Sequence, residues 1–316
     1  MSDPSLKRLQ YFIALAEHGK FQLAADAVNI SQPALSAELK RLEDFVGKPL
    51  FHRSPVTKLT AAGEALLPYA KSAVGAAHRF NEYAAAVNTG APTSISIGTV
   101  ATFLHRGLPQ TITDFSAAHP DILVTTEEAT SAAQSDMLLG HDIDIACGHM
   151  PLQHPGVVCT PAARESFWLC APTGSPITSI AEAVDSPFVI FRKSASPIYH
   201  DTVVGICRTH GFEPQIHHRT ASWSAAVEMV AHGLGVSLVP SPVARSYHGD
   251  ERLTFTRVGT RPNAPQAWIT VRREDQSTLI GDLALDLVIA SESLADPVAD
   301  SVVDPVASPV ADPVAE

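Results

Sequence analysis

Apolar residues recur three or four positions apart in three short segments of residues 1–58, the spacing of amphipathic helices. The pattern predicts one helix over 6–16 and a second over 21–28. A third begins after Ile30 and ends at Gly47, a typical C-terminal cap. Three short helices with a tight turn between the second and third form a helix-turn-helix pattern.

The segment that follows changes from short helices to a wing and one long helix. β-Branched residues around Ser54-Pro55 predict a small β-wing. An alanine- and leucine-rich stretch predicts a single linker helix over 59–88, although Pro68 would kink it. Such a helix would be a lone rod unless another chain covered its apolar stripe. We therefore expect a dimerisation helix, followed by a hinge at 89–92.

Beyond the hinge, short apolar strands alternate with helices, which indicates an α/β domain with largely parallel sheets. Sheets of this type bind ligands at the carboxyl ends of their strands, near helix N-termini. The predicted strands are 94–98, 122–126, 143–147, 167–171, 188–191, 235–239 and 268–271. The predicted helices are one through Leu108 and Phe115, then 131–139, 200–210 and 224–232.

Charge is distributed unevenly along the 316 residues, which carry a net charge of −11. Residues 1–58 hold eight Lys/Arg against six Asp/Glu, whereas the remainder holds 14 against 27. A polyanionic partner is therefore restricted to the N-terminal segment. From Asp296 the chain repeats units such as DPVA, whose proline content forbids a helix, so we expect 292–316 to be a disordered acidic tail.

Composition indicates an ordinary cytoplasmic globular protein. No stretch approaches the roughly 20 apolar residues that span a bilayer, and the N-terminus has no apolar signal region, so no membrane partner is expected. The four cysteines contain no CxxC pair, which favours buried thiols in a reducing compartment over a zinc or redox site. We expect no cofactor and no metal.

The third helix presents a low outer face. With about 100° between residues, Leu35, Leu39 and Leu42 point inward and small or polar residues point outward. Such a face can enter a DNA major groove about 12 Å wide, where a carboxamide can read adenine and cations can meet phosphates. A solvated face in a plain helical bundle is the alternative. The candidate DNA-binding residues are Ser31 as the N-cap, Gln32, Pro33, Ser36, Ala37, Lys40 and, in the wing, Arg53.

Several motifs in this region resemble the LysR-type transcriptional regulators. They are the helix-turn-helix, the LE…GKPLFHR run that includes Glu43 and Gly47, and LTAAGEALLPYA at 59–70. The family often has arginine where this chain has Ala37. The resemblance implies a winged helix-turn-helix that binds double-stranded DNA at a pseudo-palindromic operator. It also implies a homo-oligomer, with a dimer of dimers expected, and makes RNA polymerase a further candidate partner.

The resemblance continues through most of the remaining chain, in ISIGTVATFLHRGLPQTITDFSAAHPDILV, MLLGHDIDIACG and VAHGLGVSLVPS. It implies a regulatory domain over 93–291, built like a type II periplasmic binding protein, that takes a small-molecule effector. Subdomain I would comprise 93–162 and 268–291, and subdomain II would comprise 163–267. The fold class is thus α+β multidomain.

Hydroxyl-bearing residues at three predicted helix N-termini are the candidate effector site, since free amides and hydroxyls there favour a carboxylate. They match the positions where effector-responsive family members hold inducers, although each Thr or Ser could equally be a plain helix cap. The segment SASPIYHDTV also resembles regulators of aromatic-compound breakdown, which suggests an aromatic acid or ring-cleavage product. The candidates are Thr99, Val100, Ala101, Thr102, Thr130, Ser131, Ser196, Pro197, Tyr199 and, as an aromatic wall, Trp223.

Other functional classes find less support in the sequence. No HExxH, GxSxG or GxxxxGK[ST] motif occurs, and GLGVSL at 233–238 lacks the last glycine of GxGxxG, so we expect no enzyme. A stand-alone solute receptor would explain the α/β part without the helix-turn-helix. His217-His218 is expected to be a surface pair rather than a metal site. Cys207 has no second cysteine in the preceding segment, so no redox switch is expected.

Overall fold

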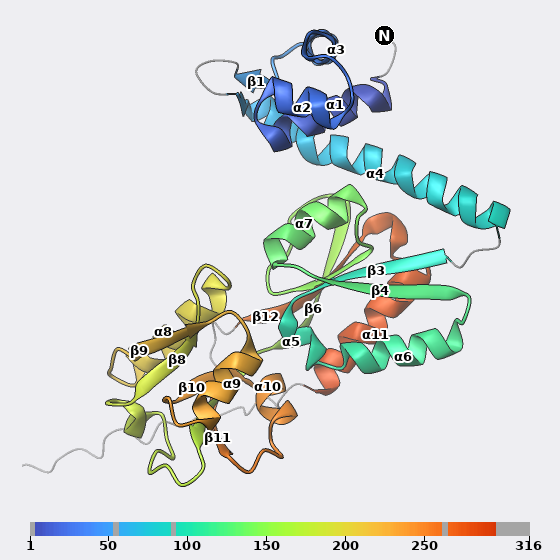
Figure 1. The fold of residues 1–316 in the computed structure, drawn as a ribbon. Helices are drawn as coiled ribbons and strands as arrows, with labels where there is room; N and C mark the ends of the chain where they lie inside the picture. Colours follow the sequence, from blue (N-terminus) through green and yellow to red (C-terminus); the bar gives the residue numbers. More distant parts are fainter. Residues whose placement is uncertain (1–3, 53–56, 90–92, 261–264, 295–316) are drawn as a thin grey trace, which may run out of the picture.

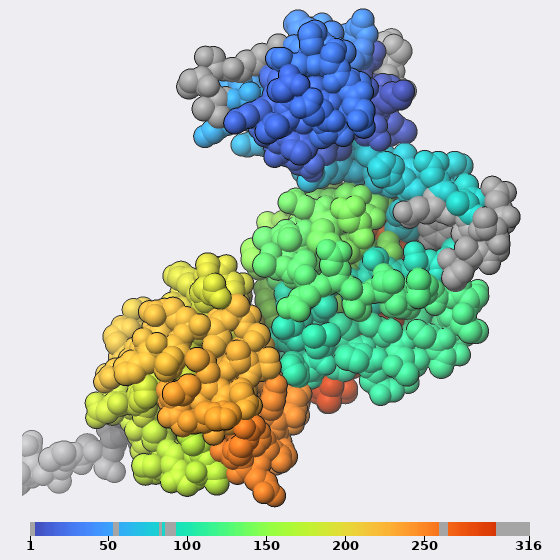
Figure 2. All heavy atoms as spheres, viewed as in Figure 1, coloured from blue at the N-terminus to red at the C-terminus, as the bar shows by residue number. Residues whose placement is uncertain are grey.

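The computed structural model describes residues 4–52, 57–89, 93–260 and 265–294. It shows a helical N-terminal domain, a long helix and two α/β lobes (Figure 1). The space-filling view shows the N-terminal domain set apart from the lobes, with the long helix between (Figure 2). Arg53, residues 90–92 of the expected hinge and residues 295–316 of the expected tail lie outside the described residues.

The N-terminal domain consists of the helices α1 (Leu6–His18), α2 (Phe21–Ala27) and α3 (Gln32–Val46). Gly19 ends α1 and Gly47 ends α3 in the left-handed conformation, at φ of 63° and 77°. The three leucines predicted to face inward on α3 are at most 3% exposed. They pack with Phe12, Leu15 and other residues of one hydrophobic cluster, so the predicted orientation of α3 is confirmed.

The wing and the long helix follow directly. Strands β1 (Phe51–His52) and β2 (Lys58–Leu59) pair antiparallel, with Phe51 opposite Leu59. Helix α4 (Ala61–Thr89) begins two residues later than predicted because Thr60 caps it, with its Oγ1 accepting from the Gly63 amide at 3.1 Å. The sequence predicted that another chain covers this helix; within the chain itself, α1 and α7 already pack against parts of it.

Subdomain I is a five-stranded sheet with helices on both faces (Figure 1). Its strand order is β4 (Ile122–Glu128), β3 (Thr93–Thr99), β5 (Ile145–Gly148), β12 (Gln266–Arg272) and β6 (Val157–Arg164). Helices α6 (Leu108–Ala118) and α11 (Leu279–Ser293) share one hydrophobic cluster with the sheet. Helix α7 (Ser131–Gly140) covers the other face with a smaller cluster around Leu138 and Ala146. The short helix α5 (Ala101–Leu104) follows β3.

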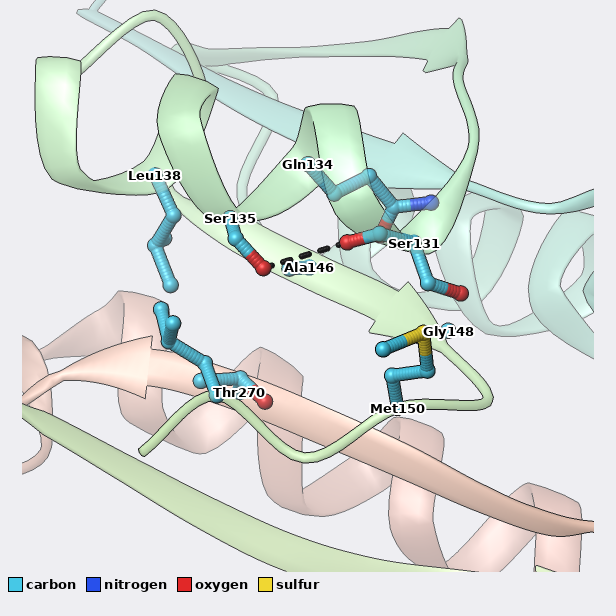
Figure 3. A pocket seen from close by; sticks show the side chains of 9 residues that line it. Ser131, Gln134, Ser135, Leu138, Ala146, Gly148, Met150 and Thr270 are labelled. Atoms are coloured by element: carbon cyan, nitrogen blue, oxygen red, sulfur yellow. Dashed lines mark hydrogen bonds between the residues drawn. The ribbon is translucent and has the colours of Figure 1, made fainter. Parts of the chain in front are cut away.

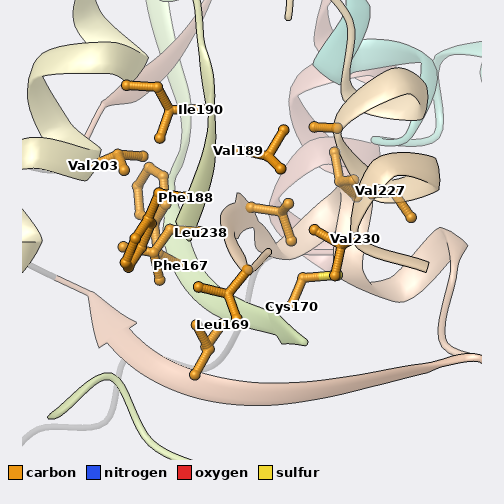
Figure 4. Packing of buried hydrophobic residues seen from close by; sticks show 14 of the residues in the cluster. Phe167, Leu169, Cys170, Phe188, Val189, Ile190, Val203, Val227, Val230 and Leu238 are labelled. Carbon is orange, nitrogen blue, oxygen red and sulfur yellow. The ribbon is translucent and has the colours of Figure 1, made fainter. Parts of the chain in front are cut away.

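Subdomain II has two smaller sheets around a hydrophobic cluster that includes Phe167, Phe188 and Val230 (Figure 4). The antiparallel sheet contains β10 (Ser237–Pro240), β7 (Ser166–Pro172) and β11 (Leu253–Thr260). The parallel pair contains β8 (Pro187–Phe191) and β9 (Gln215–Thr220). The helices are α8 (Pro197–Thr209), α9 (Trp223–Ala231) and α10 (Ser241–Ser246).

The expectation of largely parallel sheets is wrong for about half of the structure. Strands β3, β4 and β5 are parallel, but β12 runs antiparallel to both β5 and β6, and the β10-β7-β11 sheet is entirely antiparallel. At the first passage between the subdomains only Glu165 separates β6 from β7, so no helix lies between these two strands. Strands β6, β9 and β11 were not predicted, since their polar residues and prolines mask the alternation.

Candidate functional site

Helix α3 exposes the face that the sequence predicted. Gln32, Pro33, Ala37 and Lys40 are exposed, and Ser36 is half-buried. Ser31 is the N-cap, with its Oγ accepting from the Ala34 amide at 3.4 Å. The small side chains of this face leave the helix backbone accessible to a groove.

The predicted cation on that face is already engaged. Lys40 Nζ donates to Asp44 Oδ1 at 2.9 Å, and both side chains are more than half exposed. An exposed pair of this kind contributes little stability, so a phosphate could replace Asp44 at small cost. A neighbouring ion pair joins Arg8 and Glu38 at 2.8 Å, and the hydrogen bond from Arg8 lowers the pKa of Glu38.

The LE…GKPLF run has a structural explanation in the carboxylate of Glu43. Glu43 is buried at the end of α3, and its Oε1 accepts from the backbone amides of Leu50 and Phe51 at 2.9 and 3.4 Å. Gly47 supplies the left-handed turn between them. This clamp fixes where the wing leaves α3.

In the α/β region, the structure brings four of the predicted effector residues into one polar and aromatic cluster around His149. Thr102 Oγ1 lies 2.8 Å and Tyr199 Oη 3.0 Å from His149 Nε2. Ser131 Oγ accepts from the His149 backbone amide at 3.0 Å. Trp223 packs edge-on against Tyr199, with ring centroids 5.1 Å apart.

These residues come from both subdomains. Thr102 lies on α5, Ser131 begins α7, and His149 directly follows the carboxyl end of β5, all in subdomain I. Tyr199 lies on α8 and Trp223 begins α9, both in subdomain II. The cluster therefore lines the junction of the two lobes, at strand ends and helix N-termini.

Two charged residues that the sequence reasoning did not select complete the cluster. Arg106 NH2 lies 2.5 Å from Glu165 Oε2, and both side chains are fully buried. Tyr199 Oη donates to Glu165 Oε1 at 3.0 Å. One network thus runs from Thr102 through His149, Tyr199 and Glu165 to Arg106.

Glu165 lies at the crossover between the lobes. It separates β6 of subdomain I from β7 of subdomain II, and its backbone amide donates to Pro265 O, on the return crossover, at 2.9 Å. A change in the angle between the lobes must therefore act on this carboxylate and on its partners.

The cluster is electrically balanced. Burial lowers the pKa of His149, although Glu165 acts in the opposite direction, so its imidazole is neutral at neutral pH. Burial, with the negative charge of Glu165, raises the pKa of Tyr199 well above its ordinary value, so the phenol keeps its proton. The positive charge of Arg106 is balanced by the negative charge of Glu165.

The other predicted effector residues have local structural roles. Thr130 Oγ1 caps α7 by accepting from the Ala133 amide at 3.3 Å, and Thr99 Oγ1 donates to the Val100 carbonyl at 3.1 Å. Both are capping or turn contacts, the alternative to a ligand contact that the sequence allows for these residues. Half-buried Val100, Ala101 and Ser196 and exposed Pro197 lie at the starts of α5 and α8, and no side-chain bond caps either helix.

A small open pocket lies beside the cluster, on the α7 face of the sheet (Figure 3). Ser131, Gln134 and Gly148 line the end of the pocket that includes the cluster residue Ser131 (Figure 3). Leu138 and Thr270 line the other end, and exposed Met150 lies at the rim. The pocket's polar lining joins the predicted Ser131 to a part of subdomain I that the sequence reasoning did not select.

Comparison with known families gives two matches that together cover most of the chain. Residues 6–64 match the model of the bacterial regulatory helix-turn-helix protein, lysR family. Residues 88–288 match the LysR substrate binding domain.

Among individual proteins, the chain is 30% identical over 281 residues to the HTH-type transcriptional regulator AlsR of Bacillus subtilis, covering 87% of this chain and 92% of AlsR. It is 26% identical to the HTH-type transcriptional regulator BenM of Acinetobacter baylyi, over 92% of this chain and 98% of BenM. Among solved structures, CbnR, a LysR family transcriptional regulator, matches 91% of this chain and 99% of its own, with a TM-score of 0.60 and 25% identity. A second structure, full-length CbnR complexed with target DNA, matches at a TM-score of 0.58 and 26% identity.

Proposed function

The chain belongs to the LysR family of bacterial transcriptional regulators, and from that premise we propose how its DNA-binding helix and its lobe junction work together. It is a DNA-binding regulator with an effector-binding domain, and its relatives are regulators rather than enzymes. We propose that residues 1–58 form the DNA-binding domain, 59–88 the linker and 93–291 the effector domain. None of the described helices is long and apolar enough to cross a membrane. A cytoplasmic location is part of this proposal.

Helix α3 is the proposed recognition helix. Its exposed Gln32, Pro33 and Ala37 form a face shallow enough to enter the major groove, where Gln32 would contact base edges. Lys40 would exchange Asp44 for a phosphate. Arg53 in the wing is proposed as a second phosphate contact.

A second copy of the chain is the proposed partner of α4. Exposed apolar residues recur at helical spacing along α4, with Phe80 73% exposed and Tyr69, which also contacts the ring of His154, 55% exposed. The exposed alanines Ala65, Ala73 and Ala76 belong to the same series. Packing two such helices would bury both aromatic side chains and place two copies of α3 on a pseudo-palindromic operator. We propose a dimer of dimers, acting beside RNA polymerase.

The cluster around His149 is the proposed effector site. The main observation in its favour is the hydrogen-bonded series Thr102–His149–Tyr199, which joins the two lobes. A ligand that inserts between these groups must change the relation of the lobes, and a ligand with different affinity for the two arrangements shifts their populations.

A small organic anion, such as an aromatic acid or ring-cleavage product, is the proposed effector. Thr102, Ser131 and Tyr199 offer hydroxyl groups, and Tyr199 and Trp223 offer aromatic faces. Glu165 already neutralises Arg106. The anion must therefore either replace Glu165 as the partner of Arg106 or bind together with protonation of His149.

The test is a thermal-shift screen of the full chain against small carboxylates, with benzoate and cis,cis-muconate included. A ligand that binds only the folded state raises the melting temperature. We expect the shift to disappear in Thr102→Val and Tyr199→Phe while operator binding persists. Thr130→Val, at an exposed helix cap, is the matched control and should keep most of the shift. A carboxylate that still raises the melting temperature of both Thr102→Val and Tyr199→Phe would place the effector site elsewhere.

A further inference from the structure

Helix α4 meets subdomain I through a backbone contact that leaves no room for a side chain. A Cβ atom added at Gly75 would lie 2.0 Å from the carbonyl oxygen of Gly140 and 2.6 Å from its carbonyl carbon. Gly140 is the last residue of α7. The two helices, which lie next to each other in Figure 1, therefore touch at a point where only glycine fits on α4.

One turn further along α4, a buried charge cluster holds the same face. Arg79 NH1 forms an ion pair with Asp144 Oδ1 and lies 3.8 Å from Asp275 Oδ2. Arg272 pairs with both carboxylates, at 2.6 and 2.7 Å. All four side chains are at most 17% exposed, and their charges cancel. Loss of Arg79 would leave two buried carboxylates facing one guanidinium.

The cluster is anchored in the sheet rather than on a loose surface. Asp144 Oδ2 accepts from the Ser96 amide, in β3, at 2.9 Å. Arg272, at the end of β12, donates to the carbonyls of Leu138 and Ile143 at 3.1 and 2.7 Å. Arg79 is thus tied to β3, β12 and the turn between α7 and β5.

The first turns of α4 belong to the DNA-binding domain. Ala70 is buried in its core, Leu66 and Leu67 pack against that core, and Lys71 lies 3.4 Å from Glu17 of α1. Gly75 is only five residues beyond Ala70, about 8 Å along a helix. The same rigid helix therefore holds the DNA-binding domain at one end and subdomain I at its middle.

The part of subdomain I that receives α4 also reaches the cluster around His149. Helix α7 runs from Ser131 at the lobe junction to Gly140 under α4. Strand β5 leads from the region of Asp144 to His149. Each of these two elements alone spans subdomain I, from the contact with α4 to the lobe junction.

We propose that Gly75 and Arg79 are positioning residues, which fix α4, and with it the DNA-binding domain, on the end of the α7–β5 unit opposite the lobe junction. Subdomain I then sets the direction in which α3 is presented. This role goes beyond the proposed effector function and holds whatever the lobe junction binds.

The test measures the distance between the two bodies within one chain. Spin labels carried by non-natural amino acids replace Lys20 of the DNA-binding domain and Asp121 of subdomain I, both exposed, so the native cysteines stay untouched. Labelled chains are diluted into excess unlabelled protein so that pulsed electron spin resonance reports intrachain distances. Wild-type protein should give one dominant distance.

Gly75→Ala is the sharpest variant because alanine favours a helix more than glycine does, so α4 itself is not weakened. Its Cβ must move from 2.0 Å to beyond 3.0 Å from the Gly140 oxygen, which forces the helices apart. We expect a shifted or clearly broadened distance distribution. Arg79→Met should do the same, and Arg79→Lys should recover much of the wild-type distribution. Gly205→Ala, where an added Cβ meets nothing within 4 Å, is the control and should match wild type.

Wild-type distance distributions in both Gly75→Ala and Arg79→Met would overturn the proposal. Melting of each variant, followed by far-ultraviolet circular dichroism, which reports the helices of both the DNA-binding domain and the effector domain, identifies any general loss of folding. A distribution that changes in a variant with an unchanged melting temperature supports positioning. Loss of folding in Arg79→Met leaves the decision to Gly75→Ala.

Discussion

The buried pair of Arg106 and Glu165 allows the structure of the lobe junction to be tested by stability. Glu165→Gln keeps the shape of the side chain and an acceptor for Tyr199, but it leaves the Arg106 guanidinium buried without a counter-charge. Removing one partner of a fully buried ion pair costs about 3–5 kcal/mol. The double variant Arg106→Met/Glu165→Gln removes the stranded charge, so we expect it to be more stable than the single variant by about 2 kcal/mol.

The assay is urea unfolding followed by tryptophan fluorescence. The chain has three tryptophans, Trp168, Trp223 and Trp268, and none of them lies in the DNA-binding domain or α4. The signal therefore reports the effector domain alone, which avoids the mixed transition of a multidomain chain. Operator binding by each variant, measured at a temperature where it is folded, shows whether the DNA-binding domain is intact.

Two results would show that Arg106 and Glu165 are not a buried ion pair. A cost below about 1 kcal/mol for Glu165→Gln would mean that solvent reaches Arg106. Effects of Arg106→Met and Glu165→Gln that add within about 0.5 kcal/mol would mean that the two groups are independent.

Four further predictions concern other parts of the chain. Gln32→Ala should reduce base discrimination at one operator position by about 1–3 kcal/mol, measured by titrating operators with each base there. Phe80→Ala should weaken self-association in sedimentation experiments, whereas Leu285→Ala, also exposed, should not. Because the pKa of free His149 is lowered and a bound carboxylate would raise it, carboxylate affinity by calorimetry should increase from pH 8 to pH 6. Burial and the nearby arginines lower the pKa of His141 to about 4, so the free energy of unfolding should fall as the pH drops from about 6.5 toward 4. In urea titrations His141→Asn, whose side chain suits the φ of 63°, should lose less free energy of unfolding over this pH range than wild type.

The sequence predicted the elements that depend on local pattern. The helical periodicity of 29–43 identified the buried leucines of α3 and its exposed face, because a single amphipathic helix is determined by spacing alone. The ends of the helices at Gly19 and Gly47 followed from the freedom of glycine to adopt positive φ. The boundary of α4 was less accurate, since Thr60 is both a strand neighbour and a cap.

The polar cluster could be predicted only in part. Hydroxyls at helix N-termini pointed to Thr102 and Ser131, and the same signal selected Thr130, which caps its own helix. His149, Arg106 and Glu165 gave no local signal, because each looks like an ordinary loop residue in the sequence. They come together with Tyr199 only when the two lobes pack against each other. Glu165 and Tyr199, for example, are 34 positions apart in the sequence. The buried arginines Arg79 and Arg272 were missed for the same reason.

The most direct test of the central claim, that α3 reads DNA through its shallow face, is operator affinity after that face is blocked. An operator is selected from random DNA with the wild-type chain, and anisotropy titrations compare wild type with Ala37→Trp. Because Ala37 is exposed, the larger side chain leaves the fold intact but holds the helix away from the groove. We expect at least a hundredfold loss of operator affinity at an unchanged melting temperature. Wild-type affinity in Ala37→Trp would show that α3 does not bind DNA through this face.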